Sequence, residues 1–332
     1  MALDVLRGFA LLGIVGANII LYDITTMAEI EPAYRELPVS DLGAPFMIFT
    51  LVFVINKMMA VFSMLFGTGV LLATDKAEAN SSRGWQTYFR RNLLLLAIGL
   101  AHTWFWIGDI LTLYAICALV LYFFRKQSPK VLVGAALLLW YWAPVTWLLF
   151  GWGPHGDEYF SRAFSMMLFG MGLYRLGIIN GQKPAAWYRK RAVESLLLGL
   201  PFVSLAWFSD SNASAWNNFG VPAIAFGYVC GVMWICQTDS LLSLRQRLAA
   251  AGQMALTNYL AQTLLGVAFY QLLERVGITP NAMLLGLGML AIWAIQLAWS
   301  PLWLRSFKYG PLEWAWRSAT YGKRFPMAKK NY

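Results

Sequence analysis

Long runs of apolar residues, separated by short polar segments, dominate this chain of 332 residues. About 20 apolar residues let a helix cross the hydrocarbon core of a bilayer, and a helix pairs its own backbone groups, so each long run predicts a membrane-spanning helix. The second run is too long for a straight crossing, which predicts a tilt, a break near Asn56 and Lys57, or a first piece lying on the membrane surface. Ten runs fit this description: 5–22, 44–74, 89–107, 109–125, 130–150, 161–179, 192–208, 217–237, 253–274 and 281–304.

Positively charged residues indicate the orientation of these runs. With the N-terminus in the cytoplasm, 22 of the 26 lysines and arginines lie on the cytoplasmic side, whereas the first external loop, 22–43, is acidic. We therefore expect an all-α, polytopic helical bundle over residues 1–304, in the cytoplasmic (inner) membrane, with both termini in the cytoplasm. Residues 305–332 are expected to form a cytoplasmic interfacial helix and a basic tail.

The composition excludes an ordinary soluble protein. Apolar residues make up 59% of the chain and charged residues 13%, against roughly 45–50% and 25% in soluble domains. The net charge of +10 follows the predicted sidedness, so we interpret it as a topology signal and an attraction to anionic lipids, not to nucleic acid. Cys117, Cys230 and Cys236 lack the spacing of a metal site. Phosphate-binding loops, nucleophile elbows and dinucleotide fingerprints are absent, so no metal or nucleotide cofactor is predicted.

Two segments of the chain resemble each other. Residues 62–69 and 164–172 share a Phe-Ser-Met start and a Gly-x-Gly end, and both lie in runs predicted to cross from outside to inside. An internal repeat of this kind occurs in transporters, where the site lies between the halves. The alternative is that small residues simply let helices approach closely.

Polar side chains inside the predicted spans are costly in a membrane, so they are the candidates for binding substrate. Asp4 and Arg7 lie one helical turn apart near the cytoplasmic surface, where they either contact substrate or pair as an anchor. Asn18 lies further along the same helix and either lines a passage or ties two helices together. Lys57 should meet a carboxylate, snorkel, or line a wet cavity, and we favour the cavity.

His102 is the histidine that falls within a predicted span. Because histidine exchanges protons near neutral pH, it is a candidate general base or proton relay; the alternative is a hydrogen-bonded packing residue. Asp109 lies about 10 Å further along a continuous helix, too far for a direct bond. It is expected to cap the following helix, although a chain reversal at Gly108 would bring it nearer to His102.

Two further segments carry polar groups of interest. Asn258 and Gln262 share one face of the ninth span, and their amides either hold a ligand or bind neighbouring helices. Residues 310–317 predict a short helix with a proline at its start and a Glu313–Arg317 pair. We expect this helix to act as an anchor at the inner interface.

Taken together, these stretches resemble the YeiB family of bacterial membrane proteins. The most distinctive are Met254-Ala-Leu-Thr-Asn-Tyr-Leu-Ala-Gln262 and Gly310-Pro-Leu-Glu-Trp-Ala-Trp-Arg317. The resemblance covers nearly the whole chain, through residues 3–14 with Asn18, 62–69, 90–91, 99–102, 108–114, 254–262, 310–317 and 320–322.

That family is distantly similar to two groups of transmembrane acyltransferases, the acyltransferase-3 proteins and the heparan-glucosaminide acetyltransferases. The resemblance implies a shared fold and the transfer of an acyl group from a cytoplasmic coenzyme A thioester to an acceptor across the membrane. Acyltransferase-3 proteins carry an Arg, ten residues and a His in their first span; here Arg7 is followed at that distance by Asn18. The acetyltransferase group has Asn there and uses a His in the next external loop, but residues 22–43 contain none.

Two functions fit these residues. As an acyltransferase, the chain would hold an acyl-CoA-type donor with Arg7 and the basic inner face, and Asn18 and Lys57 would line the passage. His102, helped by Asp109, would then deprotonate a hydroxyl or amine acceptor. As a transporter, the chain would pass a small solute along the same residues, with His102 as the proton site.

We place acyl transfer first and keep a lipid-binding scaffold as a third alternative. The expected partners are membrane lipids and a small-molecule or lipid-linked substrate. Neither the acceptor nor an oligomeric state is predicted.

Overall fold

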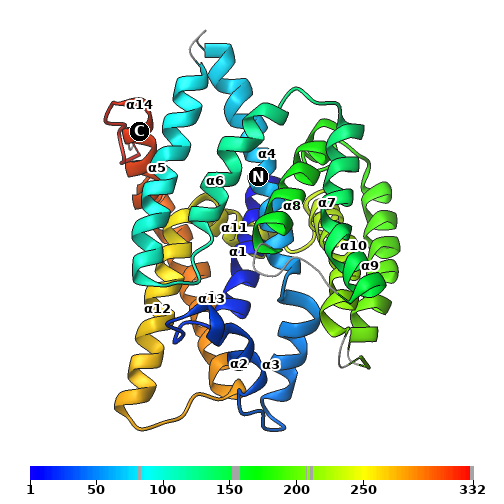
Figure 1. Cartoon of the computed structure of the whole chain (residues 1–332). Coiled ribbons are helices and arrows are strands. Elements are labelled where there is room, and N and C mark those ends of the chain that lie inside the picture. Colours follow the sequence, from blue (N-terminus) through cyan, green and yellow to red (C-terminus); the bar gives the residue numbers. More distant parts are fainter. Residues whose placement is uncertain (81–83, 152–157, 207, 210–211, 330–332) are drawn as a thin grey trace.

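The computed structural model describes residues 1–80, 84–151, 158–206, 208–209 and 212–329, and these residues are all-helical without any β-strand (Figure 1). One isolated β-bridge joins Phe307 and Ala328. Short 3₁₀ or π turns occur at Met27–Glu29, Thr50–Val54 and Tyr122–Phe124. The α-helices are α1 (Ala2–Asn18), α2 (Ile30–Arg35), α3 (Ala44–Phe49), α4 (Lys57–Asn80), α5 (Gly84–Phe105), α6 (Leu111–Leu121), α7 (Pro129–Phe150), α8 (Glu158–Arg175), α9 (Ala185–Ala206), α10 (Ala213–Cys236), α11 (Leu242–Gln253), α12 (Ala255–Arg275), α13 (Ala282–Ser306) and α14 (Pro311–Tyr321).

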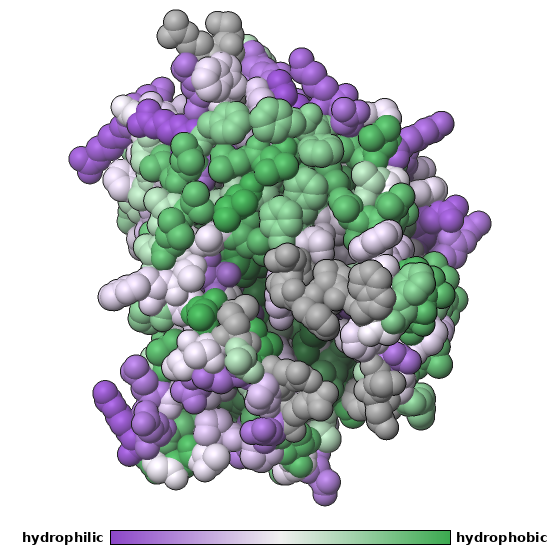
Figure 2. All heavy atoms as spheres, in the orientation of Figure 1, coloured by the Kyte–Doolittle hydropathy of each residue, from purple (hydrophilic) through white to green (hydrophobic). Residues whose placement is uncertain are grey.

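The surface has the polarity of a membrane protein. On the face shown in Figure 2, hydrophobic residues form a broad band across the molecule and hydrophilic residues gather at its upper and lower ends. Such a continuous apolar surface is stable against lipid rather than water. Within the described part of the chain, four segments are long and apolar enough to cross a membrane, and they match four of the ten predicted spans: Ala44–Lys76, Pro129–Phe150, Ala213–Cys236 and Ala282–Ser306.

The predicted break in the long second run is confirmed at Asn56. Its φ of 64° lies in the left-handed region, which asparagine tolerates better than most residues and which a right-handed helix cannot continue through. Before it lie α3 and the π turn Thr50–Val54, and α4 begins directly after it at Lys57. The break therefore divides the run into two helical pieces.

The two similar segments pack against each other where α4 crosses α8. A Cβ on Gly67 would collide with the Met167 carbonyl oxygen, and a Cβ on Gly170 would collide with the Met64 carbonyl oxygen. The Thr68 hydroxyl also donates to the Gly170 carbonyl at 3.2 Å. The contact is thus reciprocal, and the shared glycines permit the close approach of the two backbones.

A second close crossing joins α1 and α11. A Cβ on Gly8 would collide with the Leu248 carbonyl oxygen, and a Cβ on Gly252 with that of Asp4. Residues 238–252, which lie between the eighth and ninth predicted spans, are therefore mostly helical, because most of them form α11, whose last turn is buried. Arginine and glutamine lower the hydropathy of this segment, whereas its small residues supply the packing face.

Figure 1 shows how these helices are arranged along the length of the molecule. Both chain ends lie in its upper half, where α14 is near α5, and α2, α3 and the turn between α12 and α13 lie at the lower end. The predicted C-terminal helix is present as α14, but the predicted Glu313–Arg317 pair is not formed. Glu313 binds the start of α12, and Arg317 lies over the rings of Tyr309 and Phe325.

Candidate active site

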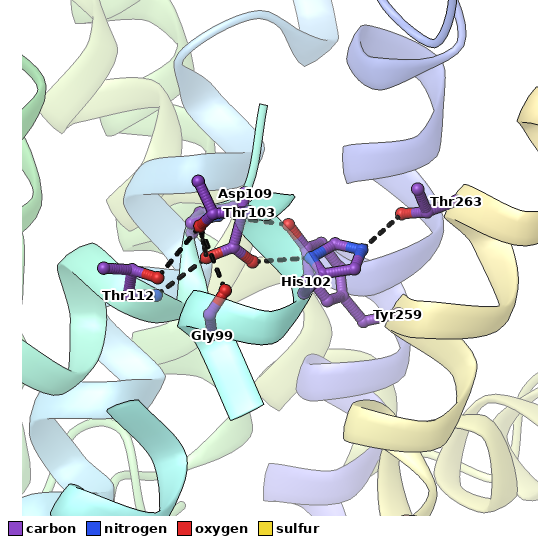
Figure 3. Close-up of polar contacts among 8 residues, drawn as sticks. Gly99, His102, Thr103, Asp109, Thr112, Tyr259 and Thr263 are labelled. Carbon is purple, nitrogen blue, oxygen red and sulfur yellow. Dashed lines mark hydrogen bonds and ion pairs between the residues drawn. The ribbon is translucent and has the colours of Figure 1, made fainter. Parts of the chain in front are cut away.

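The turn between α5 and α6 brings His102 and Asp109 together. Because α5 ends at Phe105 and α6 begins at Leu111, the chain reverses direction between them. His102 Nδ1 and Asp109 Oδ1 lie 2.7 Å apart (Figure 3), and the two side chains are 5% and 0% exposed. The chain reversal considered from the sequence therefore produces a buried carboxylate–imidazole contact.

Asp109 also caps α6, so both predicted roles belong to one side chain. Its Oδ2 accepts hydrogen bonds from the Thr112 backbone N–H at 2.8 Å and from the Thr103 hydroxyl at 3.3 Å. Gly99 allows the hairpin to close, since a Cβ there would lie 2.5 Å from the Thr112 nitrogen. These contacts fix the carboxylate in front of the imidazole (Figure 3).

Helix α12 supplies two more partners of His102. Thr263 Oγ1 lies 3.1 Å from Nε2, and the Tyr259 ring packs edge-on at 5.3 Å between ring centroids. An ionised carboxylate only accepts hydrogen bonds, so opposite such a carboxylate Nδ1 is the donor, and in that tautomer Nε2 accepts a hydrogen bond from the Thr263 hydroxyl. The carboxylate, imidazole and hydroxyl form a row, which is the arrangement in which histidine acts as a general base.

A cavity of about 560 Å³, called here the inner cavity, extends from α14 towards this row. Its volume lies in the range of small-molecule sites, roughly 300–1,000 Å³. Along α1 it runs from Asp4 to Ile14, about 15 Å of helix. Ile110 and Tyr259 line its deep end, where the Ile110 N–H donates to the Tyr259 hydroxyl at 3.2 Å. Tyr259 therefore lies between the inner cavity and His102.

The inner cavity has apolar walls and a charged mouth. The apolar lining includes Phe62, Leu65, Phe66, Val70, Leu95 and Leu111. The mouth carries four cations, Arg7, Arg91, Lys308 and Arg317, and two carboxylates, Asp4 and Glu313. Asp4 pairs with Arg7 at 2.8 Å, and the guanidinium of Arg91 stacks over the Trp316 ring at 4.3 Å. The cations outnumber the carboxylates, so the mouth is suited to an anionic group.

Glu313 ties α14 to the beginning of α12. Its carboxylate accepts hydrogen bonds from the backbone N–H groups of Leu256 at 2.7 Å and Thr257 at 3.1 Å, and from the Thr257 hydroxyl at 2.5 Å. A carboxylate is favoured at a helix N-terminus, but burial outweighs the hydrogen bonds and raises the pKa of Glu313 above its usual value. The contact holds α14 at the mouth of the inner cavity.

Asn18 lies at the end of α1, one turn beyond Ile14 of the inner cavity. Its Nδ2 atom is buried without a hydrogen-bond partner, and so is the hydroxyl of Tyr22. The Tyr22 hydroxyl faces the side chains of Asn18 and Thr263. Asn18 therefore lies beside the polar row rather than in the inner cavity.

Lys57 lies outside the inner cavity. Its ammonium donates to the Leu51 carbonyl at 2.9 Å and to Asn217 Oδ1 at 2.6 Å, with the side chain fully buried. Among the described residues no carboxylate contacts this ammonium, whose two partners are a carbonyl and an amide oxygen. The break at Asn56 exposes carbonyl groups at the end of the preceding turn, and this gives the ammonium a partner that the sequence did not reveal.

Asn258 and Gln262 bind neighbouring helices and do not line the inner cavity. Asn258 Nδ2 donates to the Ala251 carbonyl and to the Ser300 hydroxyl, both at 3.0 Å, and its Oδ1 accepts from Trp299. Gln262 Nε2 donates to Gln296 Oε1 at 2.8 Å and to the Leu11 carbonyl at 3.3 Å. Of the two predicted roles for these amides, the structure places them in the helix-binding one.

Several residues of the site were not predicted, namely Tyr22, Arg91, Tyr259, Thr263 and Glu313. Tyr259 and Thr263 are one turn apart in a segment already singled out, and their spacing could have marked a second polar face. Nothing in the spacing could have placed Tyr22 beside Thr263, because the two residues are more than two hundred positions apart in the chain.

The apolar surface, the helical bundle and the buried polar row beside a cavity define a polytopic helical membrane protein with a candidate intramembrane active site. The chain belongs to the YeiB family. The model of a family described as "Protein of unknown function (DUF418)" matches residues 173–323. An "Uncharacterized 39.9 kDa protein in amylase 3'region" of Bacillus acidopullulyticus is 30% identical to this chain, over 99% of this chain and 95% of its own length.

Two further relatives are similar over their full lengths. The "Uncharacterized protein YxaH" of Bacillus subtilis is 28% identical, over 99% of this chain and 96% of its own length. The "Uncharacterized protein YeiB" of Escherichia coli is 27% identical, over 99% of this chain and 98% of its own length. The family assignment made from the motifs is thereby confirmed.

Proposed function

We propose that this chain is a ten-span protein of the inner membrane that transfers an acyl group from a cytoplasmic acyl-CoA-type donor to an acceptor at or across the membrane. The observation that carries the proposal is the Asp109–His102–Thr263 row beyond the deep end of the inner cavity. In this proposal both termini lie in the cytoplasm, as the distribution of lysine and arginine favours.

The inner cavity supports the donor assignment. Acyl-CoA-type donors combine a phosphate-bearing head with an acyl thioester, and the cavity combines a basic mouth with apolar walls. Arginine binds phosphate through paired N–H groups, and Arg7, Arg91 and Arg317 all line the mouth. With the mouth facing the cytoplasm, the head would stay at the membrane surface while the thioester points towards Tyr259 and His102.

His102 supports the chemistry. Asp109 orients the imidazole so that Nε2 can accept a proton, and burial of the site keeps bulk water away from this proton transfer. Acyl transfer needs one group that removes a proton from the attacking hydroxyl or amine and returns one to the leaving thiolate. His102 can do both from one nitrogen, in succession.

The experiment that tests the proposal uses the purified full chain in phospholipid nanodiscs. Acetyl-CoA and palmitoyl-CoA, each labelled in the acyl group, are offered together with a bacterial membrane extract as the source of acceptor. We expect saturable binding of at least one donor and release of free thiol. His102→Ala should keep donor binding and lower thiol release on the order of 10²–10⁴-fold.

The controls separate this function from the alternative. Lys190→Ala, which removes one exposed positive charge from α9, should change neither measurement. If neither donor binds and no thiol is released, acyl transfer is wrong. If proteoliposomes containing the chain instead take up protons or a solute in a His102-dependent way, transport replaces it.

A further inference from the structure

Two hydrogen-bond donors are left without partners beside the Thr263 hydroxyl. Asn18 Nδ2 and the Tyr22 hydroxyl are buried and unpaired, and Tyr22 as a whole is only 4% exposed. An unpaired buried donor costs about 1–3 kcal/mol, so an acceptor atom that a ligand brings next to these two donors would gain their hydrogen bonds. The Tyr22 hydroxyl reaches Thr263, whose hydroxyl bonds His102, and Asn18 in turn reaches the Tyr22 hydroxyl.

Tyr22 is held at this position by its surroundings. Its ring lies so close to Gly266 that a Cβ there would collide with it, and Gly266 follows Thr263 by one turn of α12. On its other side the ring packs against Trp106, with ring centroids 5.0 Å apart. The Trp106 indole N–H donates to the Leu21 carbonyl at 3.0 Å, which fixes the backbone next to Tyr22. These contacts hold the Tyr22 ring, and with it the hydroxyl, in a fixed position.

We propose that Thr263 is the nucleophile of the transferase and carries the acyl group as an ester, while Tyr22 and Asn18 donate hydrogen bonds to the oxyanion. This inference rests on the proposed function and deepens it. Preorganised tyrosine and asparagine donors stabilise oxyanions in enzymes that transfer acyl groups, and loss of one such donor costs about 10²–10³ in rate. The row Asp109–His102–Thr263 then has the roles of orienting acid, base and nucleophile.

The first half-reaction balances as follows in atoms and charge. His102 Nε2 takes the hydroxyl proton of Thr263, and Oγ1 attacks the thioester carbonyl carbon. The carbonyl oxygen becomes an oxyanion that accepts hydrogen bonds from Tyr22 and Asn18. When it collapses, the C–S bond breaks, the thiolate leaves with the proton held by His102, and the acyl group remains on Thr263 as an ester.

The second half-reaction reverses these roles. An acceptor hydroxyl or amine gives its proton to His102 Nε2 and attacks the ester carbonyl, and the C–O bond to Thr263 breaks. His102 returns the proton to Oγ1, so no oxidant or other co-reactant is needed. Tyr259 closes the inner cavity on the side of His102, so its ring must turn aside for the thioester to reach Thr263, and a covalent intermediate then lets donor and acceptor enter one after the other.

The experiment traps the ester. The full chain in nanodiscs is mixed with the labelled acyl-CoA, without acceptor, then denatured in acid and freed of unbound donor. We expect one acyl group per chain, located by peptide mass spectrometry within Ala255–Arg275 on Thr263. Thr263→Val should carry no label, whereas Thr263→Ser should recover it, which shows that the hydroxyl and not the fold is responsible.

Matched variants test the other roles. Thr146→Val removes a buried hydroxyl that bonds only to carbonyl groups of its own helix, and should label like the wild type. Tyr22→Phe and Asn18→Leu should each slow labelling about 10²–10³-fold with unchanged donor affinity. A purely structural role of these side chains would instead change donor binding or thermal stability.

The outcomes are distinguishable. Suppose that the wild type releases thiol with acceptor present but carries no ester, and that Thr263→Val turns over equally fast. The assignment of Thr263 as the nucleophile is then wrong and the proposed function stands. Label on His102 instead of Thr263 overturns the inference in the same way. If the wild type neither binds nor consumes acyl-CoA, the proposed function fails and this inference fails with it.

Discussion

Helix α12 carries two polar faces that differ in what they bind. The cavity face consists of Tyr259 and Thr263, and the bundle face consists of Asn258 and Gln262. Both are buried pairs one turn apart, and each member of one pair is the direct neighbour in sequence of a member of the other. In a membrane either pair is costly on its own, so sequence alone treats them alike.

The partners of the two faces are different in kind. The bundle face bonds to carbonyls, a hydroxyl, an indole and another amide, groups that do not change their protonation near neutral pH. The cavity face bonds to His102, which Asp109 orients, and it lies between the inner cavity and two unpaired donors. Polarity within a membrane thus identifies a site only when a titratable group and open space accompany it.

The largest effect on turnover is expected from a substitution that disrupts the cavity face. In Asp109→Asn the amide nitrogen can donate to Nδ1 and force the proton onto Nε2, so the imidazole can no longer accept from Thr263. We expect thiol release to fall on the order of 10⁴-fold, with donor binding retained. Ser300→Ala, which alters only a partner of the bundle face, is the control and should keep turnover per folded molecule.

A stability measurement gives the complementary test of the bundle face. Asn258→Ala leaves the Trp299 indole N–H, the Ser300 hydroxyl and the Ala251 carbonyl without that partner. We expect a loss of about 1–3 kcal/mol in the free energy of unfolding, seen as a lower thermal midpoint. Thr263→Ser keeps the hydroxyl and removes one buried methyl group, so it should lower the free energy of unfolding by only about 0.5–1.5 kcal/mol. An unchanged midpoint with lost donor binding in Asn258→Ala would move Asn258 into the site.

Parts of this picture could be predicted because they depend on local chemistry. Asn56 interrupts an over-long run, and asparagine is suited to the left-handed conformation it adopts. The proline that starts α14 and the family motifs were likewise visible in the sequence. The capping role of Asp109 followed from its place after a glycine, because capping involves residues within one turn.

Other parts depend on contacts between distant segments and could not be predicted. The partner of Lys57 is Asn217, and the partner of His102 besides Asp109 is Thr263; both pairs are about 160 residues apart. Helix α11 escaped a hydropathy criterion because its packing face is made of small residues. Spacing along a chain defines which residues share a face of one helix, but it does not define which faces of different helices contact each other.

A smaller effect is expected at the mouth that serves the cavity face. Arg91 stacks on Trp316 and lines the inner cavity. Arg91→Gln removes one charge-assisted contact to a donor phosphate, so we expect roughly tenfold weaker acyl-CoA binding and a weaker salt dependence. Lys190→Ala removes the same charge elsewhere and serves as the control. Equal affinity in Arg91→Gln and wild type would place the donor outside the inner cavity.

The smallest effect concerns Glu313, which caps α12 ahead of both faces. Because burial raises its pKa in the folded chain, the folded state binds a proton more readily than the unfolded state. The stability from this group is therefore complete below the unfolded pKa and is lost as the pH rises through the folded pKa.

Glu313→Gln keeps an oxygen that accepts hydrogen bonds from the α12 backbone but cannot titrate. As the pH rises from about 4.5, its thermal midpoint should fall less than that of wild type, and Glu194→Gln, at an exposed position, should behave like wild type. Parallel curves of thermal midpoint against pH for Glu313→Gln and wild type would show that Glu313 does not titrate in this range. If thiol release nevertheless changed in this variant, the start of α12 would affect the cavity face and not the stability.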